Sequence, residues 1–165
     1  MRLRPYISFM DYEYLHKWVN DERTHSLWCA NKIPYPMTLE SLQEVLDKEA
    51  LDWGGCAYVA TTDAGEPIGF FVLSVNASKN SGFLKFVIVN NALRGKGYGT
   101  QMSRLMLKFA FEIAGVSSIQ LNVFDANESA RRCYSKVGFI EEDVVPDAFA
   151  FENESWGRCH MVLSK

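Results

Sequence analysis

The chain has 165 residues, a formal net charge of −3 and a sequence pI of about 5.6, and 48% of its residues are hydrophobic. A chain of this length and composition can bury a substantial core, so we expect residues 1–165 to form a single domain. The acidic balance excludes the basic footprint that non-specific nucleic-acid binding requires, and no nucleic-acid partner is expected.

The N-terminal third of the chain contains both extended and helical patterns. Residues 2–7 predict a short strand. Leu15, Trp18 and Val19 recur at helical spacing, which predicts a helix over residues 9–21. A proline-broken loop follows, and Thr38 is then a suitable N-cap for a helix that continues to about residue 50.

The middle of the chain changes to the two-residue period of β-strands. Residues 56–62 and 67–75 flank a turn and predict a β-hairpin, and residues 83–89 predict a third strand. These three strands follow one another without an intervening helix, so we expect them to be antiparallel.

A glycine-rich stretch follows the third strand and leads directly into an amphipathic helical pattern. The start of a helix has free N–H groups with a partial positive charge, and Gly95, Gly97 and Gly99 would leave these groups accessible. Arg94 and Lys96 add full positive charges. The pattern predicts a binding site for a pyrophosphate. A flexible surface turn is the alternative interpretation.

Two common phosphate-binding motifs do not fit this stretch. A Walker loop needs Ser or Thr after its lysine, and Lys96 is followed by Gly97. The dinucleotide fingerprint GxGxxG, started at Gly95, would need a glycine where the chain has Thr100. The predicted anion site therefore belongs to neither class.

The C-terminal part returns to alternating helices and strands. The helical pattern after Gly99 ends near residue 114, and residues 117–124 predict a strand, which makes a right-handed crossover unit. Asn127 is a suitable N-cap for a last helix, which ends at Gly138. Two final strands are predicted over the remaining residues, at about 139–149 and 158–163.

Cysteines, histidines and the N-terminus indicate a cytoplasmic protein. The four cysteines contain no CxxC pair, and the three histidines are scattered, so we expect reduced thiols and no metal site. An even number of cysteines would also permit disulfides. The first residues form neither a signal peptide nor a membrane span, and no membrane partner is expected.

Two segments resemble the signature motifs of the GNAT superfamily of N-acetyltransferases, which bind acetyl-coenzyme A. The stretch Arg94–Gly99 is similar to the motif R/Q-x-x-G-x-G/A. The second motif, N-x-x-A-x-x-x-Y-x-x-x-G-F, is matched by Asn127, Ala130, Tyr134, Gly138 and Phe139. The N-terminal LRPY, with Trp18 and Asp21, resembles the subgroup that acetylates ribosomal-protein N-termini and its polyamine-acetylating relatives.

This resemblance implies a mixed α+β fold with a central, twisted, mostly antiparallel sheet of about seven strands. The fourth and fifth strands would splay into a V, and helices would cover both faces. The pantetheine arm of acetyl-CoA would lie in the V, and its pyrophosphate would lie on the glycine-rich amides. The residues implied in coenzyme binding are Val87, Ile88, Val89, Arg94, Gly95, Lys96, Gly97, Tyr98, Gly99, Thr100, Asn127 and Ala130.

The implied reaction is direct acetyl transfer from acetyl-CoA to a primary amine, either a small amine or a peptide N-terminus. The resemblance implies that Tyr134 protonates the departing thiolate, and an ordinary tyrosine, with a pKa of about 10, keeps its proton at neutral pH. Spacing alone would make Tyr134 a core residue. A backbone N–H near Val89 would stabilise the oxyanion.

The general base departs from the family pattern. Many members have a glutamate where this chain has Asn122 or Lys85, and neither of these is a carboxylate. The remaining routes for the proton are a water chain or one of four acids, Asp21, Glu22, Glu152 and Glu154. Because no base is evident, a non-catalytic CoA-binding module is the alternative function.

The acceptor side has few sequence signals. Acidic residues at 21–22 and 141–143 favour a cationic acceptor. Trp28, Trp53 and Trp156 are candidates for lining its pocket. The open edge of the sheet is compatible with a homodimer.

Overall fold

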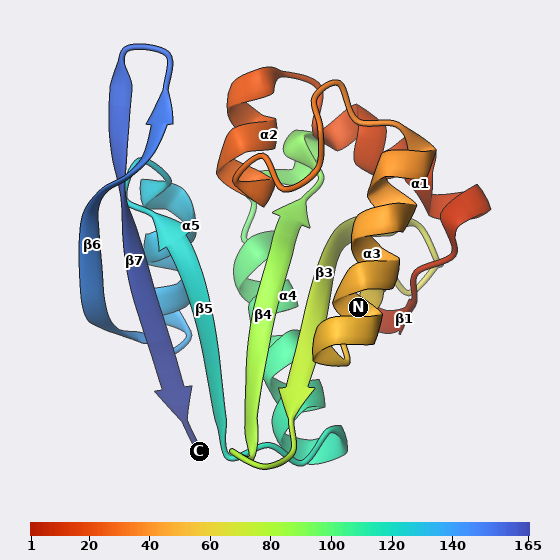
Figure 1. The fold of residues 1–165 in the computed structure, drawn as a ribbon. Coiled ribbons are helices and arrows are strands. Elements are labelled where there is room, and N and C mark those ends of the chain that lie inside the picture. Colours follow the sequence, from red (N-terminus) through yellow and green to blue (C-terminus); the bar gives the residue numbers. More distant parts are fainter.

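Seven strands form one sheet in the computed structural model, which describes residues 1–165 (Figure 1). Their order is β1-β2-β3-β4-β5-β7-β6, and only β4 and β5 pair in parallel. The predicted mixed, mostly antiparallel sheet is therefore confirmed. The strands are β1 Arg2–Pro5, β2 Cys56–Thr61, β3 Pro67–Asn76, β4 Ser81–Val89, β5 Ser118–Phe124, β6 Ile140–Phe151 and β7 Glu154–Ser164.

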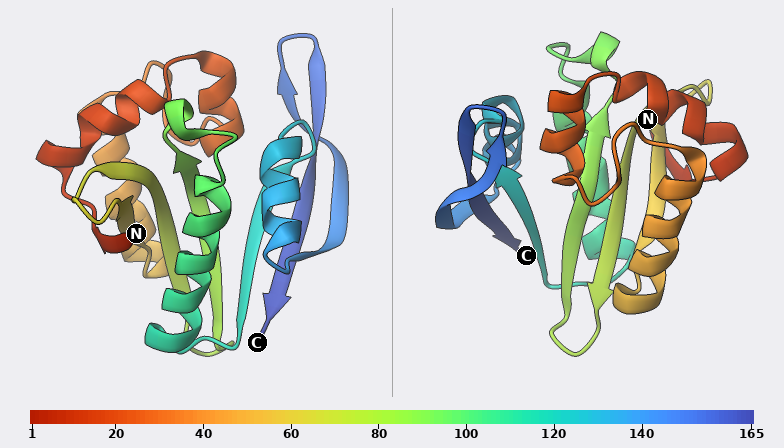
Figure 2. Two further views of the ribbon diagram at one scale, coloured as in Figure 1. Left: turned by 180° about the vertical axis from the view of Figure 1, so that it is seen from behind. Right: turned by 45° about the horizontal axis from the view of Figure 1, so that its top comes forward.

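Helices cover both faces of the sheet, as the resemblance implies. The first three α-helices lie on one face, and α4 and α5 lie on the other (Figure 2). The helices are α1 Ser8–Trp18, α2 Glu22–Cys29, α3 Leu39–Trp53, α4 Tyr98–Lys108 and α5 Glu128–Lys136, with a 3-10 turn η1 Asn91–Leu93 and a π-helical turn η2 Phe109–Ile113. None of these helices combines the length and the apolar character that crossing a membrane would require.

Each face of the sheet has its own hydrophobic core. Met102 of α4 packs in one core with Phe71, and Leu42 of α3 packs in the other with Phe70. Phe70 and Phe71 are neighbours on β3 and point to opposite faces, as the two-residue period of a strand requires. Burial on both faces makes β3 a rigid support for β4 beside it.

Side-chain caps set the starts of two helices where the sequence predicted them. The Thr38 hydroxyl accepts a hydrogen bond from the Ser41 N–H at 3.1 Å and begins α3. The Asn127 side chain accepts from the Ala130 N–H at 3.3 Å and begins α5. Each bond satisfies one N–H group that has no partner inside its own helix.

The predicted helix over residues 9–21 is wrong, because the segment contains the end of one helix and the cap of another. The Asp21 carboxylate accepts from the Thr24 N–H at 2.8 Å, so this residue starts α2. The sequence analysis treated Asp21 as the last residue of the first helix and missed α2 entirely. The helix after Thr38 also runs past residue 50 and ends at Gly54, which has a φ of 61°.

The predicted V between the fourth and fifth strands is confirmed. β4 and β5 are paired over four residues only, from Ser81 opposite Ser118 to Leu84 opposite Leu121. Beyond these pairs the two strands separate, and the gap widens towards the C-terminal end of β4 (Figures 1 and 2). The backbone of β4 after Leu84 therefore has no strand partner on that side.

A β-bulge in β4 lies where the strands begin to separate. The pairing of β4 with β3 shifts between Phe70 and Val72, and Phe86 has a φ of 50°, in the left-handed region. The Trp28 indole N–H donates a hydrogen bond of 2.7 Å to the Phe86 carbonyl. A residue of α2 thus stabilises a strained backbone position of β4.

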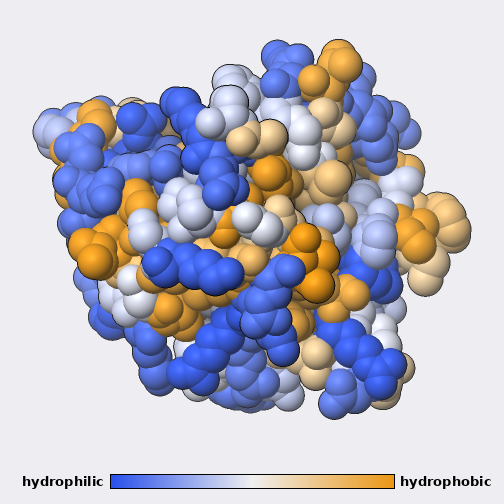
Figure 3. Space-filling model, turned by 90° about the horizontal axis from the view of Figure 1, so that it is seen from below, coloured by the Kyte–Doolittle hydropathy of each residue, from blue (hydrophilic) through white to orange (hydrophobic).

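The closed end of the V is visible from below. Hydrophilic and hydrophobic residues are interspersed over this surface (Figure 3). Five large hydrophobic side chains of the molecule remain more than half exposed, namely Phe9, Leu51, Trp53, Ile113 and Ile140. The main apolar area is buried in the two cores.

We expect Trp28→Phe to lower the free energy of unfolding by about 1–3 kcal/mol, because the buried Phe86 carbonyl would lose its hydrogen-bond donor. Denaturant unfolding followed by circular dichroism measures this change. Trp53→Phe is the matched control, since Trp53 is 63% exposed and its replacement should change stability by no more than about 0.5 kcal/mol. Equal losses in the two variants would contradict the role given to the Trp28 bond.

Candidate functional site

A cavity of about 430 Å³ lies between the separated strands on the side of α4 and α5; we call it the α4 cavity. It is lined by ten of the twelve residues that the resemblance implied in coenzyme binding, namely Val87, Ile88, Val89, Arg94, Gly95, Gly97, Gly99, Thr100, Asn127 and Ala130. Lys96 and Tyr98 are outside its wall. The Lys96 ammonium donates to the Ala92 carbonyl at 3.1 Å, and Tyr98 packs against the core.

The start of α4 offers unpaired N–H groups to this cavity. No side chain caps the helix, and the first N–H to bond inside it is that of Gln101, which donates to Gly97 at 3.1 Å. Gly97 has a φ of 84°, a left-handed conformation that glycine adopts without strain. The three preceding helical N–H groups, at residues 98–100, have no partner in the protein and are available to an anion.

The charged groups around the α4 cavity are all positive. Its wall contains Arg94, Arg132 and Lys136 and no carboxylate. Arg132 also pairs with the exposed Glu128 at 3.0 Å. Three cations together with an uncapped helix start fit the diphosphate of a coenzyme.

The sequence analysis missed two of these cations. Arg132 and Lys136 are on α5 at positions where the second motif accepts any residue. Their i, i+4 spacing would have indicated a shared helical face. It would not have shown that this face borders the start of α4, because that contact joins distant parts of the chain.

The open edge of β4 forms another wall of the α4 cavity. The Asn90 N–H donates to the Ile68 carbonyl of the β3 side at 2.9 Å. Backbone groups alternate in direction along a strand, so those of Val87 and Val89 point away from β3 towards the gap. They can form hydrogen bonds with an extended ligand as an added strand would.

Tyr134 lines the α4 cavity and also belongs to a hydrophobic core. Its ring is 7% exposed and packs edge-on against Phe139, with 5.7 Å between ring centroids. Burial, with a smaller contribution from Cys133, raises the pKa of the Tyr134 phenol above its ordinary value. The hydroxyl is therefore a neutral donor at every physiological pH.

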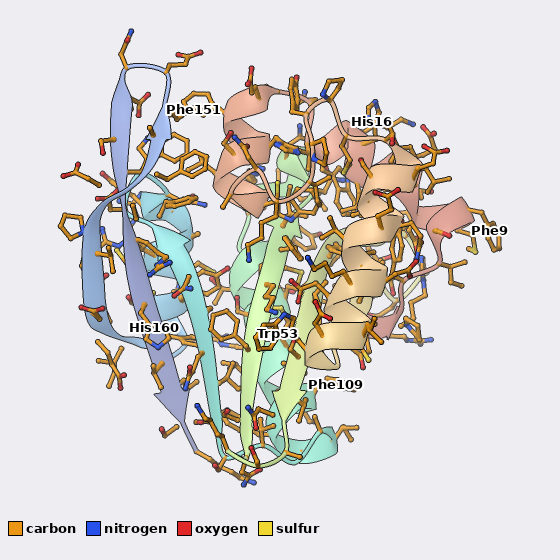
Figure 4. The ribbon with its side chains drawn as sticks, viewed as in Figure 1. Phe9, His16, Trp53, Phe109, Phe151 and His160 are labelled. Atoms are coloured by element: carbon orange, nitrogen blue, oxygen red, sulfur yellow. The ribbon has the colours of Figure 1, made fainter.

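A second cavity, of about 1130 Å³, lies in front of the separated strands beside α3; we call it the α3 cavity. Trp28 and Trp53 line it, whereas Trp156 is 2% exposed and does not. Figure 4 shows Trp53 at the end of α3, next to β4. Leu27 and Trp28 border both cavities, so α2 lies where the two meet.

The two positions where a glutamate base was sought both border the α3 cavity. The Lys85 ammonium forms an ion pair with the Glu49 carboxylate and lies 5.3 Å from the centre of the Trp53 ring. The Asn122 amide oxygen is 3.0 Å from a ring nitrogen of His160 on β7. Neither Lys85 nor Asn122 is free to act as a base.

The four acids named as alternative bases line neither cavity. Asp21 caps α2, and Glu22 and Glu152 are exposed. Hydrogen bonds from Arg23 lower the pKa of Glu154, which weakens it as a base. The acids at 141–143 are exposed on the edge strand β6, so they do not form the predicted acidic surface at the cavities.

Arg23 and Glu154 connect the two sides of the V at its open end. Arg23 of α2 forms a bidentate ion pair with Glu154 of β7. Its guanidinium also lies 5.1 Å from the centre of the Trp156 ring and 5.7 Å from that of Phe151. In Figure 4 Phe151 extends from the β6–β7 hairpin towards α2.

Comparisons with known proteins agree with this geometry. The family model of the acetyltransferase (GNAT) family matches residues 12–139. An aminoglycoside N(6')-acetyltransferase type 1 from Klebsiella pneumoniae is 26% identical over 147 residues, which cover 82% of this chain and 72% of that protein. An uncharacterized N-acetyltransferase from Methanocaldococcus jannaschii is 30% identical over 117 residues, 71% of this chain and 69% of that protein.

A solved structure has the same fold. The spermidine N-acetyltransferase of Vibrio cholerae, in complex with CoA and spermine, superposes with a TM-score of 0.82 and 22% sequence identity. The alignment covers 99% of this chain and 94% of the other. At this level of identity, the likeness concerns the arrangement of the elements.

We expect the Arg23–Glu154 pair to persist below the pH at which ordinary glutamates take up a proton. Because the folded-state pKa of Glu154 is lowered, its contribution to stability is present above the unfolded pKa and is lost as the pH falls through the folded pKa. A carbon-13 NMR titration of the assigned Glu154 carboxyl should show a pKa below that of ordinary glutamates.

In the same titration Arg23→Gln should return the Glu154 pKa towards its ordinary value. Glu141 provides an internal control, because Arg131 lowers its pKa and this pair should be unaffected by the substitution. A Glu154 carboxyl that titrates like exposed glutamates in the parent protein would exclude the pair in solution.

Proposed function

Because the chain belongs to the acetyltransferase (GNAT) family, we propose that it transfers the acetyl group of acetyl-CoA directly to a primary amine, with Tyr134 as the general acid. When bound, acetyl-CoA supplies a thioester carbonyl that an amine can attack. The observation that carries the proposal is the α4 cavity, whose wall includes both the uncapped start of α4 and Tyr134. The acceptor is a small amine or a peptide N-terminus.

The residues of the α4 cavity would bind the coenzyme along its length. The free N–H groups at residues 98–100 and the Arg94 side chain would hold the diphosphate. Val87 and Val89 would bond the pantetheine amides through their backbone. Asn127, whose side-chain oxygen already caps α5, would bind through its remaining amide protons.

Tyr134 would donate a proton to the departing sulfur. A thiol has a pKa of about 8.5, so a thiolate leaving without a proton is a poor product at neutral pH. The Tyr134 hydroxyl is protonated at neutral pH and can donate to the sulfur. Burial raises its pKa, which makes it a weaker acid, so the donation depends on the negative charge that develops on the sulfur. A backbone N–H of Val87 or Val89 would stabilise charge on the carbonyl oxygen.

The amine must lose a proton before it attacks, and no unpaired buried carboxylate lines either cavity. The two acids at the α3 cavity are Glu49, which is paired with Lys85, and Asp52, which is exposed. Water in this open cavity would therefore carry the proton. The neutral fraction at pH 7 of an α-amino group, with a pKa near 8, is roughly two hundred times that of a lysine-like amine near 10.4.

Acetylation of an amine panel by the purified protein tests the proposal. Release of free thiol from acetyl-CoA, dependent on both protein and amine, would support an N-acetyltransferase. Tight binding of CoA without turnover of any amine would instead support a non-catalytic CoA-binding module. Panel members should include amino acids, peptides with free N-termini, simple alkylamines, polyamines and aminoglycosides.

We expect Tyr134→Phe to lower kcat roughly a hundredfold, because the general acid is removed, while the dissociation constant for CoA changes little. Steady-state kinetics and isothermal titration calorimetry measure the two effects. Tyr14→Phe, an exposed tyrosine of α1, is the control and should retain full kcat. An unchanged kcat in Tyr134→Phe would remove the acid role of this residue.

We expect Gly97→Leu to weaken CoA binding by tenfold or more, since a side chain at this left-handed position would cover the free N–H groups of α4. Gly65→Leu is a matched control. Both glycines have positive φ, 84° and 91°, and open space around an added Cβ, but Gly65 is in the β2–β3 turn. Equal affinity in parent and Gly97→Leu would refute the proposed diphosphate site.

A further inference from the structure

The α3 cavity has a basic wall in an acidic protein. Its charged residues are four cations and two acids, Lys32, Lys79, Lys85, Arg158, Glu49 and Asp52. The Glu49–Lys85 pair neutralises one of each. Three cations therefore remain against the single carboxylate of Asp52, although the whole chain carries a net charge of −3. A local excess of this kind attracts anionic groups and repels polycations.

Arg158 is the cation of this wall that is best positioned for recognition. It is on β7, opposite Phe124 of β5 and Val145 of β6, so neighbouring strands fix its backbone on both sides. Its guanidinium forms no ion pair and no hydrogen bond within the protein, unlike those of Arg4, Arg23 and Arg131. The arginine fork binds a carboxylate through two parallel hydrogen bonds.

Aromatic side chains line the same cavity as this free guanidinium. Phe124 and Phe149 line the α3 cavity beside Arg158, and Trp28 and Phe86 line it at the bulge of β4. The wall thus combines an unpaired cation, an apolar surface and the open edge of β4. An acceptor with a carboxylate and an apolar body is complementary to all three features.

The absence of a free carboxylate base favours the same class of acceptor. Without a free carboxylate in the cavities, the amines that react best are those with a substantial neutral fraction at neutral pH. The α-amino groups of peptides, with pKa values near 8, meet this condition better than alkylamines. A short peptide combines such an amine with a carboxylate at its C-terminus.

Resting on the acetyltransferase function above, we propose that the acceptor is an amino acid or another amine that carries a carboxylate, and that Arg158 binds this carboxylate in the α3 cavity. Arg158 is then a specificity-determining residue. The polyamine and aminoglycoside acceptors named for relatives of this chain lack a carboxylate and would be repelled by Lys32, Lys79 and Arg158.

Pairs of amines that differ only in a carboxylate test the proposal. Suitable pairs are phenylalanine with phenethylamine, tryptophan with tryptamine, and tyrosine with tyramine, and spermidine represents the polycations. We expect at least one acid-bearing amine to be acetylated with a higher kcat/KM than its partner and than spermidine. A preference for spermidine, or for the amine without the carboxylate in every pair, would overturn the acceptor class and leave acetyl transfer intact.

Substitution of Arg158 then tests its role. For the best pair, Arg158→Gln should raise KM for the acid-bearing amine by about tenfold or more and change KM for its partner less than twofold, with kcat little altered. Each amine has the same pKa whether it is assayed with the parent protein or with Arg158→Gln. Differences in amine pKa therefore cancel when the KM values of the two proteins are compared. Arg158→Lys should restore part of the difference, because it keeps the charge.

Arg104→Gln is the matched control, since Arg104 is exposed on α4 and lines neither cavity. It should leave both KM values unchanged. Equal KM effects of Arg158→Gln on both members of the pair would overturn carboxylate binding by Arg158. Absence of turnover with every amine would overturn the acetyltransferase function itself, which is a different result.

Discussion

The structure depends on the early end of hydrogen bonding between β4 and β5. Four residue pairs join these strands, and then the β4 backbone continues without a partner. An unpaired strand edge inside a protein is costly unless something bonds to it, and here it borders a cavity that can receive an extended ligand. The bulge at Phe86, whose carbonyl accepts from Trp28, lies where this opening begins. The unpaired edge of β4 therefore shapes both the fold and the candidate binding site.

The starts of α4 and α5 contribute differently to the α4 cavity. At α4 glycines and a missing cap leave N–H groups free for an anion, whereas at α5 Asn127 caps the helix and orients it so that Tyr134 reaches the same cavity. The first arrangement favours affinity, because free N–H groups and cations bind charge. The second brings the neutral phenol of Tyr134 into the same cavity as the open edge of β4, which the proposed acid role requires.

The sequence was informative where local chemistry determines structure. Caps at Thr38 and Asn127, the hairpin of β2 and β3, and the glycine-rich start of α4 could all be read from neighbouring residues. Features that depend on contacts between residues far apart in the sequence could not be read in this way. The bond from Trp28 to Phe86 spans 58 positions, and the exposure of Arg158 to the α3 cavity depends on strand pairing between β5 and β7. The cap formed by Asp21 depends on neighbouring residues only, but the helical spacing predicted Asp21 as the last residue of the first helix and not as the start of α2.

The ion pair of Arg23 with Glu154 also affects where ligands can enter and leave the protein. It joins α2, which contacts β4, to β7 across the wide end of the V, so that end is bridged, while the two cavities lie on opposite sides of the sheet. Under the proposed function, acetyl-CoA would enter the α4 cavity from one side of the sheet and the amine would enter the α3 cavity from the other. CoA and the acetylated amine would then leave by separate routes, and neither product would block the release of the other.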